Sequence, residues 1–259
     1  MRDDSPSRTA AWVALARAMG RDLPPEAQLA DDPYGAAFEH GPRFHHLLSG
    51  RGVRVHRLPG VTSWILYMQV RTRVIDDALR AFVAGGGRQV VVLGAGYDCR
   101  ALRLPELADS RVLEIDHPAT QGHKRAVLER IGAASPAHYV TWDFETRPME
   151  DLPEVLAEAG LDVGAPVFTI WEGVTMYLTP EAIDASLRAI RSWSPPGSQL
   201  AMTYFAKSRL AQPSIATRAI QARSQRIARR ESSSRRIGTE RRPQGTCAQS
   251  RLSCFFYKK

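Results

Sequence analysis

The chain has 259 residues, enough for one α/β domain with a short appendage, and its apolar content of 44% is ordinary for a globular protein. No run approaches the ~20 consecutive apolar residues of a membrane span. The N-terminal sequence also lacks the basic and apolar regions of a signal peptide. Three scattered cysteines form neither a disulfide framework nor a metal-ligand spacing. We therefore expect a cytoplasmic protein with no membrane partner and no metal site.

The formal net charge of +8 is concentrated in one segment. Residues 207–259 hold fourteen of the 35 basic residues and two of the 27 acidic ones, so this segment carries +12 and the rest of the chain −4. A basic surface often binds nucleic acid, but here the basicity says little about the ligand of the main domain. Nucleic acid is not an expected partner. A basic arm that docks on nucleic acid or an acidic surface remains the competing interpretation of this segment.

Two helices are expected before residue 85. Residues 7–19 form an amphipathic pattern behind a Ser/Thr cap, and a loop punctuated by Pro and Asp follows. Apolar residues then recur at helical spacing over residues 63–84, until Gly85-Gly86-Gly87 stops the pattern.

After residue 85 the chain alternates between short apolar runs and segments that can form helices. The expected strands are residues 89–93, 111–115, 138–142, 167–171 and 199–205. The expected helices begin at the capping residues Thr120, Asp151 and Thr179, the last of them followed by Pro180. This alternation predicts a doubly wound, mostly parallel, Rossmann-like α/β sheet. Ligands of such sheets bind outside the carboxyl ends of the strands.

The first strand ends in the turn Gly94-Ala95-Gly96, where missing Cβ atoms let the backbone turn sharply near a ligand. The third glycine of a dinucleotide-binding G-x-G-x-x-G is absent, because Cys99 occupies that position. The turn therefore suits a nucleoside that has no pyrophosphate. This signal is weak alone, since two glycines also occur in many turns that bind nothing.

Acidic residues follow the next three strands. Glu114 or Asp116, about twenty residues after the glycines, is placed to accept hydrogen bonds from two ribose hydroxyls. Asp143 and Phe144 can offer a carboxylate and an apolar face to an adenine ring, and Glu172 can face an ammonium group. A nicotinamide-dependent oxidoreductase has no specific need for acidic residues after the third and fourth strands, so it is the weaker alternative.

The order and spacing of G-A-G-x-D-x-R, E-x-D-x-P and E-G-x-x-M-Y-L resemble the leucine carboxyl methyltransferase-like family of S-adenosylmethionine-dependent enzymes. The resemblance covers roughly residues 9–205. The segments that carry it are Ala16-Arg17-Ala18, Asp32-Pro33-Tyr34, Arg71-Thr72-Arg73, Ile75-Asp76-Asp77, LGAGYDCRALRLP, LEIDHP, WDFE and WEGVTMYL. The family usually has Thr where this chain has Cys99, a departure that the turn can accommodate.

The resemblance implies a role for each matching position. Residues expected to contact S-adenosylmethionine are Gly94, Ala95 and Gly96 at the methionine portion, Asp116 at the ribose, Asp143 and Phe144 at the adenine, and Glu172 near the amino group. An arginine of the Arg71-Thr72-Arg73 segment would pair with the carboxylate of the cofactor. Either Arg71 or Arg73 suits such a bidentate role.

The expected activity is methylation of a carboxylate or hydroxyl oxygen on a small molecule or peptide. A carboxylate, with a pKa of about 4, is already ionised and needs no general base. A hydroxyl would be helped by a base such as His117 or Tyr177, but the first is better explained as a turn residue and the second as a packing residue. We therefore assign no catalytic residue. The alternative is a homologue that binds the cofactor but is catalytically impaired.

The sequence divides into a helical cap region over residues 1–84, a Rossmann-like domain over residues 85–206 and a basic tail over residues 207–259. The tail is rich in Arg and Ser, and such a composition buries too little apolar surface to fold; it is predicted to be disordered or aberrant. Residues 211–230 can at most form a basic helix with a thin apolar stripe. The hypothesis is a replaced C-terminus, for example after a reading-frame change, that leaves the sheet incomplete and its fifth strand exposed or only loosely covered.

Overall fold

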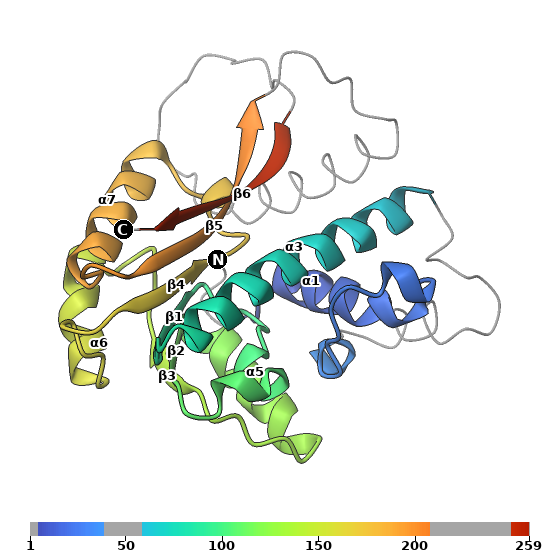
Figure 1. Ribbon diagram of the computed structural model, residues 1–259, viewed down its shortest axis with the longest axis horizontal. Helices are drawn as coiled ribbons and strands as arrows, with labels where there is room; N and C mark the ends of the chain where they lie inside the picture. The colour runs from blue at the N-terminus through green and yellow to red at the C-terminus, as the bar shows by residue number, and fades with distance from the viewer. Residues whose placement is uncertain (1–4, 39–58, 208–249, 259) are drawn as a thin grey trace.

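The computed structural model describes residues 5–38, 59–207 and 250–258, which are built around one central sheet (Figure 1). The strands follow the order β3-β2-β1-β4-β5-β6. Their bounds are Gln89–Leu93 (β1), Arg111–Asp116 (β2), His138–Thr141 (β3), Val167–Trp171 (β4), Gln199–Lys207 (β5) and Ser250–Lys258 (β6). Strands β1 to β5 pair in parallel, and β6 pairs antiparallel with β5. The predicted doubly wound, mostly parallel, Rossmann-like fold is confirmed.

Helices cover both faces of this sheet, with α6 and α7 on one side and α3 on the other (Figure 1). The α-helices are Arg8–Ala18 (α1), Pro59–Ala84 (α3), Arg100–Arg103 (α4), Pro118–Arg130 (α5), Leu152–Glu158 (α6) and Pro180–Ser192 (α7). Short 3-10 turns include Gly35–Phe38 (η3), Met149–Asp151 (η6) and Thr175–Tyr177 (η7). Among the described residues, no helix is both long enough and apolar enough to cross a membrane.

Two helices begin at the capping residues that the sequence predicts. The Ser7 hydroxyl accepts a hydrogen bond from the Ala10 N–H at 3.2 Å, and the Thr179 hydroxyl accepts one from the Ala182 N–H at 3.2 Å. Each cap satisfies a backbone donor that the first helical turn leaves without a partner.

One other predicted cap is wrong, and another lies at its predicted position without a side-chain hydrogen bond. Helix α5 begins at Pro118, and His117 Nδ1 accepts from the Ala119 N–H at 3.2 Å, so His117 and not Thr120 is the cap. A proline fits the first helical position because its fixed φ is already helical, and this moves the start of the helix upstream. Thr120 Oγ1 instead accepts from the Ser7 N–H at 3.2 Å. Asp151 precedes α6 but makes no side-chain capping bond.

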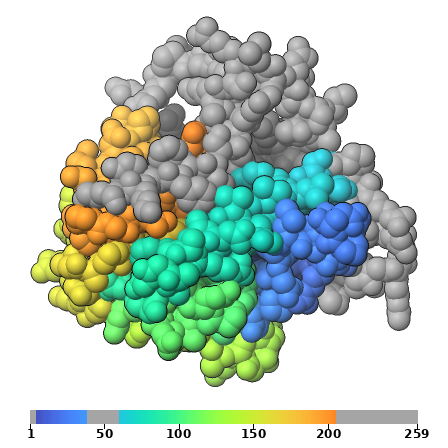
Figure 2. Space-filling model, viewed as in Figure 1, coloured from blue at the N-terminus to red at the C-terminus, as the bar shows by residue number. Residues whose placement is uncertain are grey.

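The long helix α3 begins four residues before its predicted start, at another proline, Pro59. Its buried apolar side chains are Ile65, Met68, Ile75, Leu79 and Phe82. Most of this stripe packs with apolar residues of β1, β2 and β4. Figure 2 shows the outer side of α3 lying beside α1 on the face turned toward the viewer.

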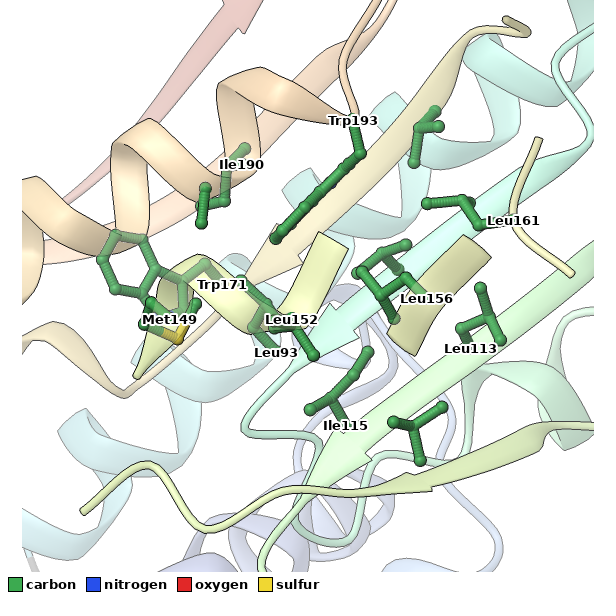
Figure 3. Close-up of a cluster of buried hydrophobic side chains, with 14 of the residues drawn as sticks. Leu93, Leu113, Ile115, Met149, Leu152, Leu156, Leu161, Trp171, Ile190 and Trp193 are labelled. Carbon is green, nitrogen blue, oxygen red and sulfur yellow. The ribbon is translucent and has the colours of Figure 1, made fainter. Parts of the chain in front are cut away.

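The opposite face of the sheet carries a larger apolar cluster (Figure 3). Side chains from the strands meet those of α6 and α7, and Trp142, Trp171 and Trp193 are among the largest fully buried residues. Parallel strands covered on both faces read as continuous apolar runs, which is why the sequence located β1 and β4 at their observed bounds.

The fifth strand is not exposed, so that part of the expectation for it is wrong. Strand β5 is paired along its whole length with β6, from Gln199 opposite Lys258 to Lys207 opposite Ser250. The composition of the whole tail hides the local run Cys254-Phe255-Phe256-Tyr257, whose aromatic residues favour a strand. The rest of the tail, including the predicted basic helix over residues 211–230, lies outside the described residues, and the three-part division of the chain stays a prediction.

Removal of β6 tests whether the tail is dispensable. A chain that ends at residue 249 would expose the backbone hydrogen-bonding groups of β5, so we expect its thermal midpoint to fall by at least about 5 °C, or about 2 kcal/mol, with more aggregation. Calorimetric unfolding of both chains under identical conditions measures this. Identical, cooperative unfolding would show that β6 contributes nothing to the fold.

Candidate functional site

The candidate site lies at the carboxyl ends of the parallel strands. Strands β1 and β4 are neighbours in the sheet although two strands separate them in the sequence, so the strand order reverses between them. In sheets of this kind, ligands bind at the point where the strand order reverses, outside the carboxyl ends of the strands. The glycine turn after β1 and Glu172 after β4 flank this position.

The turn after β1 depends on two glycines in the left-handed region, Gly94 with φ +63° and Gly96 with φ +52°. A Cβ atom on Gly94 would also lie 2.5 Å from Val174 Cγ2, so the segment after β4 packs directly on this turn. Glycine is therefore required at residue 94 by both backbone conformation and packing.

Asp116, at the end of β2, holds this turn in place. Its Oδ2 accepts from the Gly96 N–H at 2.5 Å and its Oδ1 accepts from the His117 N–H at 2.6 Å. Burial raises the pKa of Asp116, and the two backbone donors act in the opposite direction. Each carboxylate oxygen can accept a further hydrogen bond, so Asp116 can also hold ligand hydroxyls.

Glu114 forms a buried ion pair with a lysine. Its buried carboxylate contacts Lys124 Nζ of α5, which also donates to the Asp98 carbonyl oxygen. Burial opposes the charged form of Lys124, but the Glu114 carboxylate raises the pKa of the amine above its usual value. Of the two residues that the sequence left open for the ribose, Asp116 therefore remains.

Glu172 follows β4 and contacts two arginines. Arg71 Nε of α3 lies 2.6 Å from Oε1, and Arg100 Nη1 of α4 donates to Oε2 at 2.9 Å. The Glu172 side chain is only 8% exposed. Although burial opposes ionisation, the guanidinium groups of Arg71 and Arg100 lower the pKa of Glu172 to about 2. The carboxylate is thus ionised at neutral pH.

Arg100 is the centre of a wider set of buried ion pairs. It contacts Asp98, and its Nε donates to Asp76 Oδ1 at 2.7 Å. Arg103 binds the same Asp76 carboxylate through two nitrogens, at 2.5 and 2.8 Å. Burial opposes ionisation of Asp98, but Arg100 lowers its pKa below the usual range. Arg100 Nη2 is buried and has no hydrogen-bond partner within the described ranges.

A second ion pair ties the N-terminal helix to the glycine turn. Arg17 Nε lies 2.8 Å from Asp32 Oδ2, and Arg17 Nη2 donates to the Tyr97 carbonyl oxygen at 2.7 Å. Asp32 Oδ1 accepts from the Gly35 N–H at 3.0 Å, which fixes the loop before η3. Segments that are far apart in the sequence thus meet beside the turn after β1.

The structure separates the two arginines between which the sequence could not choose. Arg71 is buried against Glu172, whereas Arg73 is 51% exposed and pairs with Asp77 one turn along the helix surface. Two residues span about 200° of an α-helix, so Arg71 and Arg73 point in nearly opposite directions. Arg73 is not brought to the site with the other predicted residues.

The turn after β3 is formed by one of the predicted adenine-contacting residues. Asp143 Oδ1 accepts from the Glu145 N–H at 3.0 Å, and Oδ2 accepts from Thr146 Oγ1 at 2.8 Å. Phe144 is half-buried against the larger apolar cluster. These contacts explain the local turn, and the adenine contact of Asp143 and Phe144 remains a prediction.

The two candidate bases have different surroundings. His117 is buried and caps α5 through Nδ1, in line with its interpretation as a turn residue. Tyr177 is 52% exposed, which differs from the packing role expected of it. The His117 contact is with a backbone N–H and does not place a base against a nucleophile.

The sequence analysis assigned no role to Arg17, Asp32, Asp76, Asp98 or Arg100. One signal was available for Asp76, because it lies on the same helical stripe as the apolar Ile75 and Leu79. A charged residue on a buried stripe requires a buried partner. The identity of that partner could not be read from the pattern.

The residues present fit a nucleoside that carries a zwitterionic amino-acid end. Asp116 and Glu172 supply anionic acceptors, and Arg71 supplies a cation beside Glu172. The orphaned Nη2 of Arg100 adds a buried donor next to the same carboxylate. Within the described ranges, no group of three or more His, Cys, Asp and Glu side chains is arranged to hold a metal ion.

Comparison with known proteins places the chain in a family. The profile of the leucine carboxyl methyltransferase family matches residues 10–191. The chain belongs to this family. The match contains the glycine turn, Asp116 and Glu172, as well as the residues of the buried ion pairs.

Relatives support the family assignment, and a solved structure shares the fold. A protein of Mycobacterium sp. strain KMS, assigned as an S-adenosyl-L-methionine-dependent methyltransferase, is 37% identical over 203 residues, 76% of this chain and 66% of the relative. A Streptomyces coelicolor protein with the same assignment is 35% identical over 199 residues, 75% of this chain and 68% of the relative. This family member thus spans about two thirds of the length of these relatives. A Thermobifida fusca structure assigned as a methyltransferase shares the fold, with a TM-score of 0.51, 21% identity, and coverage of 87% of this chain and 74% of its own.

The buried pair of Lys124 and Glu114 can be tested by a double-mutant cycle. We expect Lys124→Met to lower the free energy of unfolding by about 3–5 kcal/mol, because it leaves the Glu114 carboxylate buried without a cation. Adding Glu114→Gln should recover at least about 1 kcal/mol of this loss, measured by denaturant unfolding. Strictly additive effects of the two substitutions would show that the pair is not coupled.

Proposed function

We propose that this chain is an S-adenosylmethionine-dependent O-methyltransferase that methylates a carboxylate or hydroxyl group of a small molecule or peptide. The observations that carry the proposal are the anchoring of Asp116 to the glycine turn and the buried pair of Glu172 and Arg71 after β4, in a member of the leucine carboxyl methyltransferase family. Each of these three side chains matches one polar group of S-adenosylmethionine. The absence of any candidate membrane-spanning helix among the described residues is compatible with a cytoplasmic location, which we also propose.

Asp116 would accept hydrogen bonds from the ribose hydroxyls while it remains anchored to the glycine turn. Glu172 would accept from the ammonium group, and Arg71 would bind the carboxylate of the amino-acid end. The turn Gly94-Ala95-Gly96 would pass close to the methionine portion. Asp143 and Phe144 complete the proposed site at the adenine ring.

When bound, S-adenosylmethionine supplies an electrophilic methyl group on a sulfonium. The residues of the chain have to orient the acceptor oxygen in line with that group and exclude water. A carboxylate acceptor needs no proton removed at neutral pH. His117 Nδ1 is occupied as a helix cap, which favours an acceptor that needs no base. We assign no catalytic residue. The proposed acceptor is a small molecule or a peptide.

The second candidate is a homologue that binds the cofactor without turnover. The chain spans about two thirds of its relatives, so groups that contact the acceptor in a longer protein need not be present here. A nicotinamide-dependent oxidoreductase is the weakest candidate, because Cys99 replaces the third glycine of the dinucleotide turn. Cofactor binding followed by acceptor screening separates these three functions.

Calorimetric titration with S-adenosylhomocysteine tests the cofactor site. We expect saturable binding that Asp116→Ala weakens by at least about tenfold, because the ribose hydroxyls lose a charged acceptor. Asp109→Ala, an exposed acidic residue in a turn, is the matched control and should bind like the parent chain. NAD should not compete. A cooperatively folded chain that binds NAD instead would refute the methyltransferase proposal.

Two arginines on one helix provide a second test. Arg71→Lys should weaken binding of S-adenosylhomocysteine by at least about tenfold, because lysine cannot reproduce a bidentate contact with a carboxylate. Arg73→Lys changes the same residue type two positions away and should leave the affinity within about twofold, since its partner is the surface residue Asp77. Equal losses in the two variants, measured by the same titration, would disprove the assignment of Arg71.

A further inference from the structure

We propose that Arg100 is a positioning residue that holds the Glu172 carboxylate ready for the ammonium group of the cofactor. This inference rests on the proposed function. The two oxygens of Glu172 are contacted by different arginines from different helices, Oε1 by Arg71 of α3 and Oε2 by Arg100 of α4. The two arginines therefore need not perform the same task.

The proposed function directs Arg71 toward the carboxylate of the ligand. If Arg71 is shared with the ligand in this way, Glu172 must be held by another group or it would be free to reorient. Arg100 is the group that the geometry supplies, at 2.9 Å from Oε2. A glutamate held through one oxygen by a fixed arginine can offer its other oxygen to an ammonium group.

Arg100 is itself fixed more firmly than a single ion pair would allow. Its side chain is 2% exposed, its Nε donates to Asp76 at 2.7 Å and its backbone N–H donates to Asp98 Oδ1 at 2.7 Å. Asp76 is in turn bound by both terminal nitrogens of Arg103. These contacts connect α3, α4 and the glycine turn. Through Arg100, the position of the Glu172 carboxylate therefore depends on all three.

Charges on every element around Glu172 decide its ionisation. Arg71 of α3, Arg100 of α4 and Arg17 of α1 favour the carboxylate form, whereas burial and Asp98 of the turn after β1 oppose it. Removing the charge of Arg100 leaves Glu172 and Asp98 with one cation fewer in a buried setting. The pKa of Glu172 should then rise above its value of about 2.

A protonated Glu172 would no longer carry the charge that attracts an ammonium group. Loss of Arg100 should therefore weaken ligands that carry the amino-acid end, and the loss should grow as the pH falls. A ligand without that end should be unaffected. S-Adenosylhomocysteine and 5′-methylthioadenosine form such a pair, since they share the adenosine and differ in the amino-acid end.

The experiment measures the affinity of both ligands by calorimetry for the parent chain and for Arg100→Gln, from about pH 7.5 to about pH 5.5. For the variant we expect S-adenosylhomocysteine to bind about tenfold more weakly near pH 7.5 and weaker still near pH 5.5, with 5′-methylthioadenosine within about twofold throughout. The parent chain should show a ratio of the two affinities that does not depend on pH. Arg80→Gln removes a partly exposed cation of α3 that pairs with Asp77 and Glu106 at the surface, and it should keep the parent ratio.

Equal losses for both ligands, or a ratio that stays independent of pH in Arg100→Gln, would overturn the positioning role and leave Arg100 as a structural residue. If Arg100→Gln does not fold, Arg100→Lys retains the charge and should show a smaller, ligand-specific loss; an unchanged ratio there would equally overturn the inference. A folded parent chain that binds neither ligand would instead refute the proposed function on which the inference rests.

Discussion

A charged side chain is stable in a protein interior only where it contacts a partner of opposite charge. The position of the elements around the candidate site depends on one such set of contacts, the buried ion pairs of Arg100. Arg100 contacts Asp76, Asp98 and Glu172, which belong to α3, to the turn after β1 and to the end of β4. Because an unpaired buried charge is strongly unfavourable, these three elements cannot separate independently. The ends of β1 and β4 are thereby held together at the point where the strand order reverses.

A buried set of ion pairs is weak evidence for stability, since apolar residues of similar volume often stabilise a core as well or better. Here the ion pairs fix the positions of charged groups beside the glycine turn. The apolar clusters on both faces of the sheet already provide the main burial, and the ion pairs lie at one edge beside the glycine turn. A site for a zwitterionic ligand needs both signs of charge at fixed positions, which apolar packing cannot supply.

The fold was predictable because its signal is local. Buried parallel strands are short continuous apolar runs, and the helices between them have their own caps and periodicity, as at Thr179. The wrong predictions have local causes too. Pro118 moved the start of α5 upstream and made His117 its cap, and the aromatic run before Lys258 was masked by the Arg- and Ser-rich composition of the whole tail. Antiparallel pairing of β6 with β5 joins residues about fifty positions apart, and composition carries no information on such a register.

For the candidate site, the sequence predicted which residue types are present and at which strand ends they lie. Sequence alone identified the turn Gly94-Ala95-Gly96 and the acidic ends of the strands, because these signals depend on spacing and on the position of a residue after a strand. Only the tertiary structure decided that Arg71 rather than Arg73 faces Glu172, and that Glu114 is committed to Lys124. Ion pairs join residues distant in the chain, so the choice of partner follows from which side chains the packed helices and strands bring within contact in a buried setting.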